Sequence, residues 1–92
     1  MAALSQADID ARLRSVPEWR IEGGELTRTF TRNDFVASLL FVNKVGDLAE
    51  RAGHHPDIDI RYTQVRLALV THDAGGLTAK DFDLAAAVDK LG

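Results

Sequence analysis

The chain has 92 residues, of which 46% are hydrophobic and 27% charged, with no cysteine and a formal net charge of −3. This length predicts a single domain over residues 1–92, and the lack of cysteine excludes disulfides, thiolate metal sites and thiol catalysis. The negative charge and scattered Lys and Arg argue against nucleic acid as a partner, and the absence of a signal peptide or of an apolar run approaching about 20 residues predicts a cytoplasmic protein outside the membrane.

The first predicted elements are a helix and a hairpin. The helix begins at about residue 5, because Ser5 is a good N-cap and Asp8, three positions later, completes a capping box. It stops before Pro17. The apolar period then changes to two, and Gly23-Gly24 provides a tight turn between two alternating runs. This pattern predicts two antiparallel strands.

The second predicted helix is more apolar than one buried face requires. Thr31 is its predicted N-cap, and Asp34 lies in the first turn. Its apolar residues are Phe35, Val36, Leu39, Leu40, Phe41, Val42 and Val45. A helix that is apolar around much of its circumference is covered on more than one side, and a second subunit is the natural cover in so small a domain. Gly53 fits the left-handed position just past the helix end.

A second hairpin and a third helix complete the chain. Apolar residues alternate from residue 58 to Tyr62, which predicts that Tyr62 is a core residue, and Thr63-Gln64 is the predicted turn into the next strand. The third helix begins at about residue 78, with Thr78 as N-cap and Asp81 as the capping-box acid. The order α-β-β-α-β-β-α predicts an α+β fold, with one four-stranded antiparallel sheet and the helices packed on one face.

The residues best suited to chemistry are the three histidines, His54, His55 and His72, which lie within nineteen positions. Histidine exchanges protons near neutral pH. Glu50 lies four residues before His54, so the two side chains would meet if the helix continued, and the carboxylate would favour the charged imidazolium. Pro56 favours extended backbone at His55, which would send the two adjacent side chains to opposite faces.

Simpler interpretations of these residues stay open. Glu50 can be a solvated acid, the histidine pair a helix-capping and a surface residue, and Asp81 only a helix cap. A metal site is disfavoured, because adjacent histidines lack the i, i+4 spacing with which a helix presents two rings to one ion. The glycines at 75 and 76 accompany no phosphate-binding motif.

The spacing of these residues resembles the signature of the pterin-4a-carbinolamine dehydratases. The matching pattern is Glu50, three residues, His54-His55-Pro56, five residues, Tyr62, nine residues, His72, eight residues, Asp81. The resemblance extends from about Leu4 to Leu91. It implies the αββαββα fold, dimers or tetramers formed through the sheet edge and the long helix, and, in some animal members, binding to a homeodomain transcription factor.

The resemblance also implies an activity. It is a hydro-lyase reaction on a pterin substrate, 4a-hydroxytetrahydrobiopterin, which loses water to give quinonoid dihydrobiopterin in the recycling of tetrahydrobiopterin. No metal or other cofactor is expected, because the elimination is internal to the substrate. By resemblance, His54 and His72 deliver protons to the hydroxyl from opposite faces, and His55 acts near N5 or holds the ring.

Three supporting roles and one departure follow from the same resemblance. Glu50 would orient and charge His54, Asp81 would support the loop that carries His72, and Pro56 would set the approach of the histidine pair. Gly53 stands where the family usually has Asp or Asn; it keeps the turn but lacks a side chain for the substrate. The alternative function is a non-catalytic binding or dimerisation module, in which the apolar second helix docks a partner.

Overall fold

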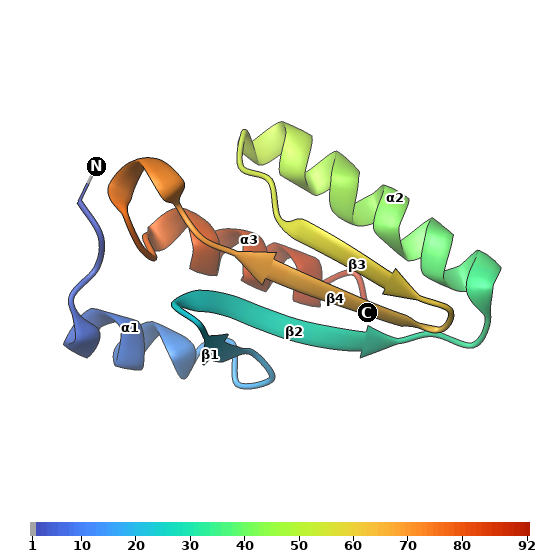
Figure 1. Cartoon of the computed structure of the whole chain (residues 1–92), viewed down its shortest axis with the longest axis horizontal. Coiled ribbons are helices and arrows are strands. Elements are labelled where there is room, and N and C mark those ends of the chain that lie inside the picture. Colours follow the sequence, from blue (N-terminus) through green and yellow to red (C-terminus); the bar gives the residue numbers. More distant parts are fainter. Residues whose placement is uncertain (1) are drawn as a thin grey trace.

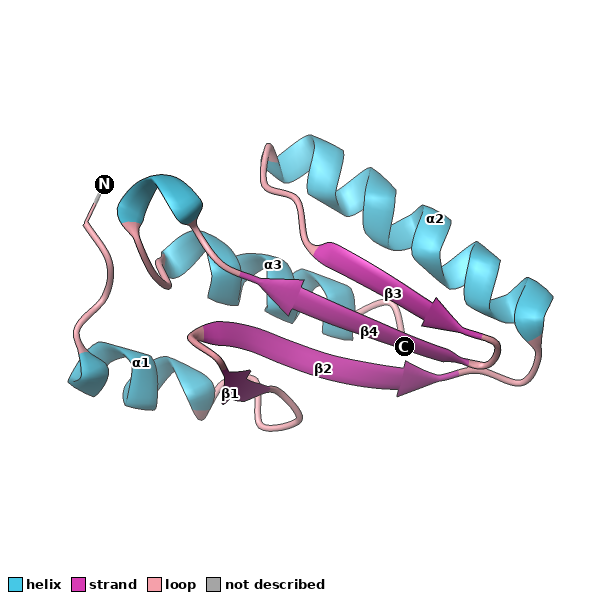
Figure 2. Ribbon diagram, viewed as in Figure 1, coloured by secondary structure: helices cyan, strands magenta, loops and turns pink. Residues whose placement is uncertain are grey.

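The computed structural model describes residues 2–92 and has the predicted order of elements (Figures 1 and 2). Its helices and strands are α1 (Gln6–Leu13), β1 (Arg20–Glu22), β2 (Glu25–Thr31), α2 (Phe35–Ala52), β3 (Asp57–Arg61), β4 (Gln64–Leu69), the 3₁₀ turn η1 (His72–Ala74) and α3 (Ala79–Asp89). The α-β-β-α-β-β-α prediction is therefore confirmed, with η1 added between β4 and α3.

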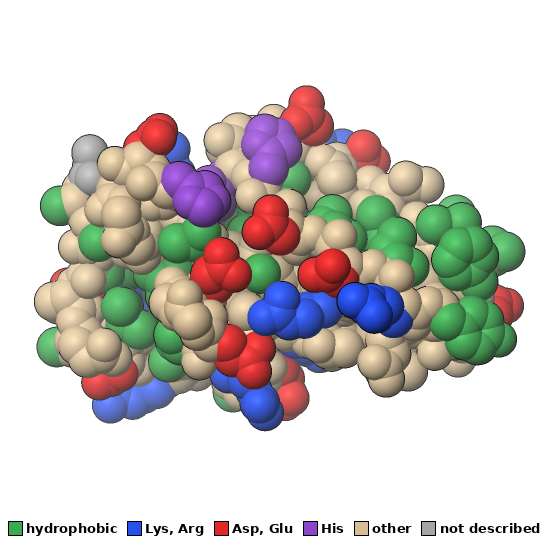
Figure 3. All heavy atoms as spheres, in the orientation of Figure 1, with side chains coloured by type: hydrophobic (Ala, Val, Ile, Leu, Met, Phe, Trp, Pro, Cys, Tyr) green, Lys and Arg blue, Asp and Glu red, His purple; other side chains and the backbone are tan. Residues whose placement is uncertain are grey.

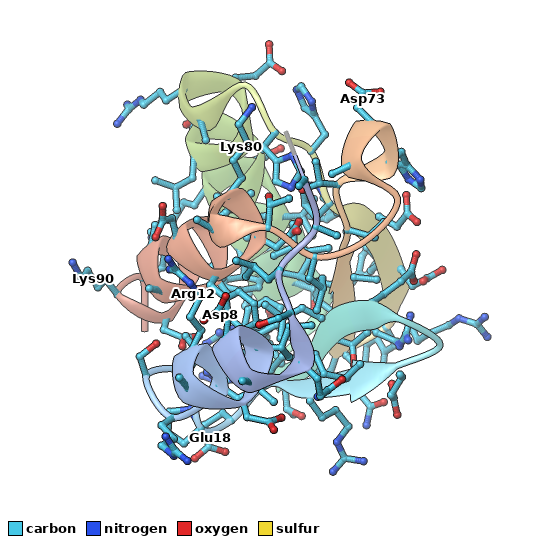
Figure 4. All side chains as sticks on the ribbon, turned by 90° about the vertical axis from the view of Figure 1, so that its left-hand side faces the viewer. Asp8, Arg12, Glu18, Asp73, Lys80 and Lys90 are labelled. Atoms are coloured by element: carbon cyan, nitrogen blue, oxygen red, sulfur yellow. The ribbon has the colours of Figure 1, made fainter. Side chains whose placement is uncertain are left out.

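The four strands form one antiparallel sheet in the order β1-β2-β4-β3. Figure 1 views this sheet from its uncovered side, with α3 behind it. Figure 4, turned by 90°, shows the helices on one side and the sheet on the other, as predicted. Strands β2 and β4 are central, so the segment that follows β4 emerges in the middle of the sheet, close to the end of α2.

The core lies between the sheet and the two longer helices. Side chains alternate between the two faces of a sheet, so Val65, Leu67 and Leu69 of β4 all face the helices. On β2, Leu26 and Phe30 face the same way, with Arg28 between them bonded to Asp89 at the end of α3. The buried residues of these strands include Leu26, Phe30, Val65, Leu67 and Leu69. Helix α2 packs Phe41, Val45 and Ala49 against them, and α3 packs Phe82, Ala85 and Val88. The opposite face of the sheet carries charged side chains, visible in Figure 3 as red and blue groups.

Helix α2 begins later than predicted. Ser5 and Thr78 cap α1 and α3 as expected, but the N-cap of α2 is Asp34, whose Oδ1 accepts a hydrogen bond of 2.8 Å from the amide of Ala37. The predicted cap, Thr31, is the last residue of β2 and pairs with Gln64 of β4. The strand ladder therefore occupies the residue that the capping pattern had assigned to the helix.

Tyr62 is not a core residue, so the prediction that it lies in the core is wrong. The two-residue turn between β3 and β4 consists of Tyr62 and Thr63, because Arg61 already pairs with Gln64. Tyr62 takes a positive φ of 55°, and 69% of its surface is exposed. The strand therefore ends one residue earlier than the apolar alternation indicates, and the turn lies one residue before the predicted Thr63-Gln64.

The apolar surplus of α2 is confirmed as an exposed face. Phe35, Val36, Leu39 and Leu40 are all large hydrophobic residues with considerable exposure. Figure 3 shows hydrophobic side chains gathered at this end of the molecule, over the start of α2. Within residues 2–92, none of the helices has the length and apolar character that crossing a membrane would require.

Candidate active site

The three histidines border one open pocket of about 300 Å³. The pocket lies where the end of α2, the end of β4 and the start of α3 meet, and Figure 3 shows histidine side chains gathered there. Gly53, Thr71, Asp73 and Lys80 also line it. His54 and His72 are 18 positions apart in the chain, and they border the same pocket because β4 is a central strand.

Gly53 sets the directions of the two adjacent histidines. It ends α2 in the left-handed conformation, with φ 63° and ψ 31°, as predicted. The backbone then leaves the helix axis and runs through Pro56 into β3. As a result the side chain of His54 turns inward and is only 12% exposed, whereas that of His55 turns outward and is 63% exposed.

His54 is held by a buried carboxylate. Its Nε2 lies 2.5 Å from Oδ1 of Asp81, whose side chain is completely buried. Asp81 is in the first turn of α3, where its other oxygen, Oδ2, accepts the amide hydrogen of Thr78 at 2.9 Å. The acid in the first turn of α3 therefore also contacts a pocket histidine, a contact that the sequence did not predict.

The same carboxylate is tied to the strand end that leads to His72. The hydroxyl of Thr71 donates to Asp81 Oδ2 at 2.9 Å and lies 2.8 Å from the hydroxyl of Thr78. All three side chains are buried. A polar group removed from water in this way is stabilised only when its hydrogen bonds are made, and here each one finds a partner.

Glu50 pairs with His55, which corrects the predicted Glu50–His54 contact. Glu50 Oε2 hydrogen-bonds Nε2 of His55, five residues along the chain. The predicted i, i+4 contact requires a continuous helix, but α2 ends at Ala52, and the left-handed turn at Gly53 carries His54 away from Glu50. Both members of the observed pair are exposed to solvent.

His72 stands in a tight loop beside the pocket. The loop is closed at its neck by an isolated bridge between Thr71 and Gly76, and Gly75 takes the positive φ of 72° that the turn requires. His72 is exposed at the start of η1. Within residues 2–92, the His72 ring has no hydrogen-bond partner, so both of its nitrogens are available to a molecule in the pocket.

Thr71 and Lys80 line the pocket, although the sequence did not predict either of them as a site residue. Figure 4 shows Lys80 near the start of α3 and Asp73 on the η1 turn, both at the end of the molecule where α2 ends. Each is a direct sequence neighbour of a predicted site residue, Thr71 of His72 and Lys80 of Asp81. That adjacency was the available signal, but neither residue type stands out in a surface loop or a helix start.

The arrangement offers acid–base groups rather than a nucleophile or a metal cage. His54 is largely buried and paired with a carboxylate, His55 is exposed and paired with a carboxylate, and His72 has free nitrogens within residues 2–92. Over residues 2–92, no three His, Asp or Glu side chains converge as ligands for one metal ion. Histidines placed around a pocket can give protons to one atom of a bound molecule and remove them from another.

Known proteins are similar to this chain in sequence and in fold. The chain is 59% identical to a protein of Acidobacterium capsulatum, covering 99% of each chain, and 58% identical to one of Chloroflexus aurantiacus, covering 99% of this chain and 98% of the other; both carry the name pterin-4-alpha-carbinolamine dehydratase. A crystal structure from Brucella melitensis, described as a transcriptional coactivator/pterin dehydratase, superposes with a TM-score of 0.91 at 27% identity over 97% of both chains.

A second solved structure shows another use of a similar chain. A pterin dehydratase-like protein, described as a RuBisCO assembly factor in the alpha-carboxysome, matches with a TM-score of 0.68 at 27% identity, covering 80% of this chain and 88% of the other. The model of the family described as pterin 4 alpha carbinolamine dehydratase matches residues 2–91. On this match and on relatives of more than 50% identity, the chain belongs to the pterin 4 alpha carbinolamine dehydratase family.

Proposed function

We propose that this chain is a hydro-lyase that removes water from a 4a-hydroxytetrahydropterin, the reaction for which its family is named. The observation that carries the proposal is the pocket bordered by His54, His55 and His72, two of them paired with carboxylates. The product is the quinonoid dihydropterin, and the biological role is the recycling of a tetrahydrobiopterin-type cofactor.

The reaction needs two proton transfers on one substrate. A proton is delivered to the 4a-hydroxyl, the C4a–O bond breaks with release of water, and the proton on N5 is removed as the C4a=N5 double bond forms. We assign delivery to His54 and His72, and removal at N5 to His55. Each such transfer by a positioned group accelerates a reaction by about 10²–10⁴-fold.

The supporting residues have roles that differ from those inferred from the sequence. Asp81, rather than Glu50, orients His54, since it lies against Nε2 of that ring. Glu50 acts on His55, from an exposed position. Pro56 favours extended backbone at His55, just before the chain enters β3. Lys80 adds a cation at the pocket rim.

The activity is tested by mixing the protein with freshly generated 4a-hydroxytetrahydropterin and following the absorbance of the quinonoid product in a stopped-flow instrument. We expect dehydration faster than in buffer alone. A variant with alanine at His54, His55 and His72 should return the rate to the buffer value while its circular dichroism spectrum is unchanged. Equal rates for the two proteins would reject the assignment.

A second candidate function is binding without catalysis. It is favoured by the exposed apolar face of α2, formed by Phe35, Val36, Leu39 and Leu40, and by the assembly role described for one similar structure.

We propose that a second copy of the chain covers this face in a homodimer or homotetramer. Sedimentation should show an oligomer that Leu40→Glu dissociates; a wild-type monomer would leave the face free for another partner.

A further inference from the structure

We infer that the hydroxyl of Thr71 positions the Asp81 carboxylate so that His54 holds its hydrogen on Nε2 and exchanges protons through Nδ1. Thr71 is thus a positioning residue that acts through Asp81. The inference deepens the proposed dehydratase function and rests on it only for the identity of the substrate, because the state of the His54 ring can be observed without turnover.

The direction of each hydrogen bond around Asp81 follows from counting hydrogens. Oδ2 accepts from the amide of Thr78 and from the hydroxyl of Thr71, each at 2.9 Å. A threonine hydroxyl has a single hydrogen, and that of Thr71 is already given to Asp81. The 2.8 Å contact between the two hydroxyls therefore has Thr78 as donor. The buried chain runs in one direction, from Thr78 through Thr71 to Asp81.

The two donors at Oδ2 leave Oδ1 for His54. Oδ1 lies 2.5 Å from Nε2. The two donors at Oδ2 favour the charged carboxylate over the acid, and a carboxylate can only accept, so Nε2 carries the hydrogen. In the neutral ring Nδ1 then has the lone pair. Among residues 2–92, Nδ1 has no hydrogen-bond partner, and His54 lines the pocket. Nδ1 is therefore the atom through which His54 takes up and returns protons.

Thr71 also connects His54 to His72. Its amide donates to the carbonyl of Gly76 at 3.2 Å, and its carbonyl accepts from the amide of Ala74 at 3.0 Å. These backbone bonds close the loop that carries His72, while the side chain holds the carboxylate that faces His54. One buried residue thus relates the positions of two histidines that come from different elements.

The main test removes only the hydroxyl, with Thr71→Val, and restores it with Thr71→Ser. Thr27→Val is the matched control, because Thr27 is also buried and its hydroxyl donates to Glu22 at 2.9 Å, away from the pocket. The hydrogen bond from Thr27 is the largest cause of the lowered pKa of Glu22, and the hydrogen bond from Arg66 is the next. We expect kcat to fall about tenfold in Thr71→Val with a smaller change in KM, to recover in Thr71→Ser, and to stay within about twofold in Thr27→Val.

The ring state is read directly from the ¹⁵N chemical shifts of His54 in the free protein. The wild type should show hydrogen on Nε2, and Thr71→Val should show a mixture of tautomers. Asp81→Asn is the stronger variant: two donors hold the amide oxygen at the Oδ2 position, so the NH₂ group faces His54 and should move its hydrogen to Nδ1. This variant also decides the matter if Thr71→Val does not fold.

Two results would overturn the inference. One is hydrogen on Nδ1 of His54 in the wild type, and the other is a Thr71→Val protein whose ring shifts and kcat match those of Thr27→Val. A protein without dehydratase activity, but with the expected tautomers in the wild type and in Asp81→Asn, would reject the proposed function and leave the ring assignment intact.

Discussion

Two adjacent histidines, His54 and His55, each pair with a carboxylate, but the two pairs differ in their exposure to solvent. His54 and Asp81 form a pair that is 12% and 0% exposed, whereas His55 and Glu50 are 63% and 77% exposed. Asp81 lies 27 residues after its histidine and Glu50 only five before. The His54–Asp81 pair connects the end of α2 to the start of α3, whereas the His55–Glu50 pair lies on the surface at the end of α2.

The same two chemical groups therefore contribute differently to stability in the two pairs. An exposed ion pair contributes about 0–1 kcal/mol, because water and salt screen it and two mobile side chains must be ordered. A buried carboxylate depends on each of its hydrogen bonds, since breaking one leaves a polar group without a partner. The environment, rather than the pairing itself, decides which carboxylate matters for stability and geometry.

The largest difference is expected between Asp81→Ala and Glu50→Ala. Asp81→Ala removes the capping-box acid of α3 and leaves His54 and Thr71 without their acceptor, so the free energy of unfolding should fall by about 2–4 kcal/mol. Glu50→Ala should move the midpoint of thermal unfolding by less than about 3 °C. Urea and thermal unfolding followed by circular dichroism measure both, and similar losses in the two variants would contradict the comparison.

The next difference concerns catalysis by the histidines themselves. His54→Ala should reduce kcat by about 10²-fold or more, and His55→Ala by about tenfold, since the buried ring is held in one orientation and the exposed ring is not. His72→Ala is expected to lose at least about tenfold. Stopped-flow assays of the three variants give the order, and a larger loss for His55 than for His54 would reverse the assignment.

Gly53 should affect both pairs through the backbone. Its φ of 63° is unfavourable for a side chain, although no atom lies within 4 Å of a Cβ placed there. Gly53→Ala is therefore expected to destabilise the protein by about 1 kcal/mol, and Gly53→Asn by less, because Asn tolerates this conformation. Denaturant titration of the two variants separates backbone strain from steric contact; equal stabilities would exclude strain as the cause.

The smallest expected effect is a dependence on salt. At 1 M salt the screening length is about 3 Å, which weakens exposed pairs far more than buried ones. The kcat ratio of wild type to Glu50→Gln, less than about fivefold at low salt, should approach one in 1 M NaCl. The corresponding ratio for Asp81→Asn should not change. A salt-sensitive Asp81→Asn ratio would show that water reaches the buried pair.

Much of the fold could be predicted because local signals agreed with it. Ser5 and Thr78 lie where no strand competes, so their capping patterns located α1 and α3. Thr31 carries the same pattern, but it also continues the β2 ladder, and the tertiary pairing with Gln64 prevails over the cap. Tyr62 continues the apolar alternation of β3, yet the hairpin closes one residue earlier than its sequence indicates.

The site was harder to predict than the fold, for a physical reason. The resemblance indicated which histidines belong together, but their partners depend on where the chain turns. Spacing alone paired Glu50 with His54, and the left-handed residue at Gly53 breaks the helical path that this pairing assumes. The contact between His54 and Asp81 spans 27 residues. No local pattern predicts it, because it arises when α3 docks beside the end of α2.

The double use of Asp81 has a consequence for how this chain can change over evolutionary time. A mutation that removes the carboxylate costs the protein a helix start and a histidine anchor in one step, so selection meets a single substitution with two penalties. Glu50 carries no such burden and can vary at little cost to folding. A related chain without catalytic function would therefore be expected to retain Asp81, which stabilises the start of α3, while Glu50 could be replaced freely.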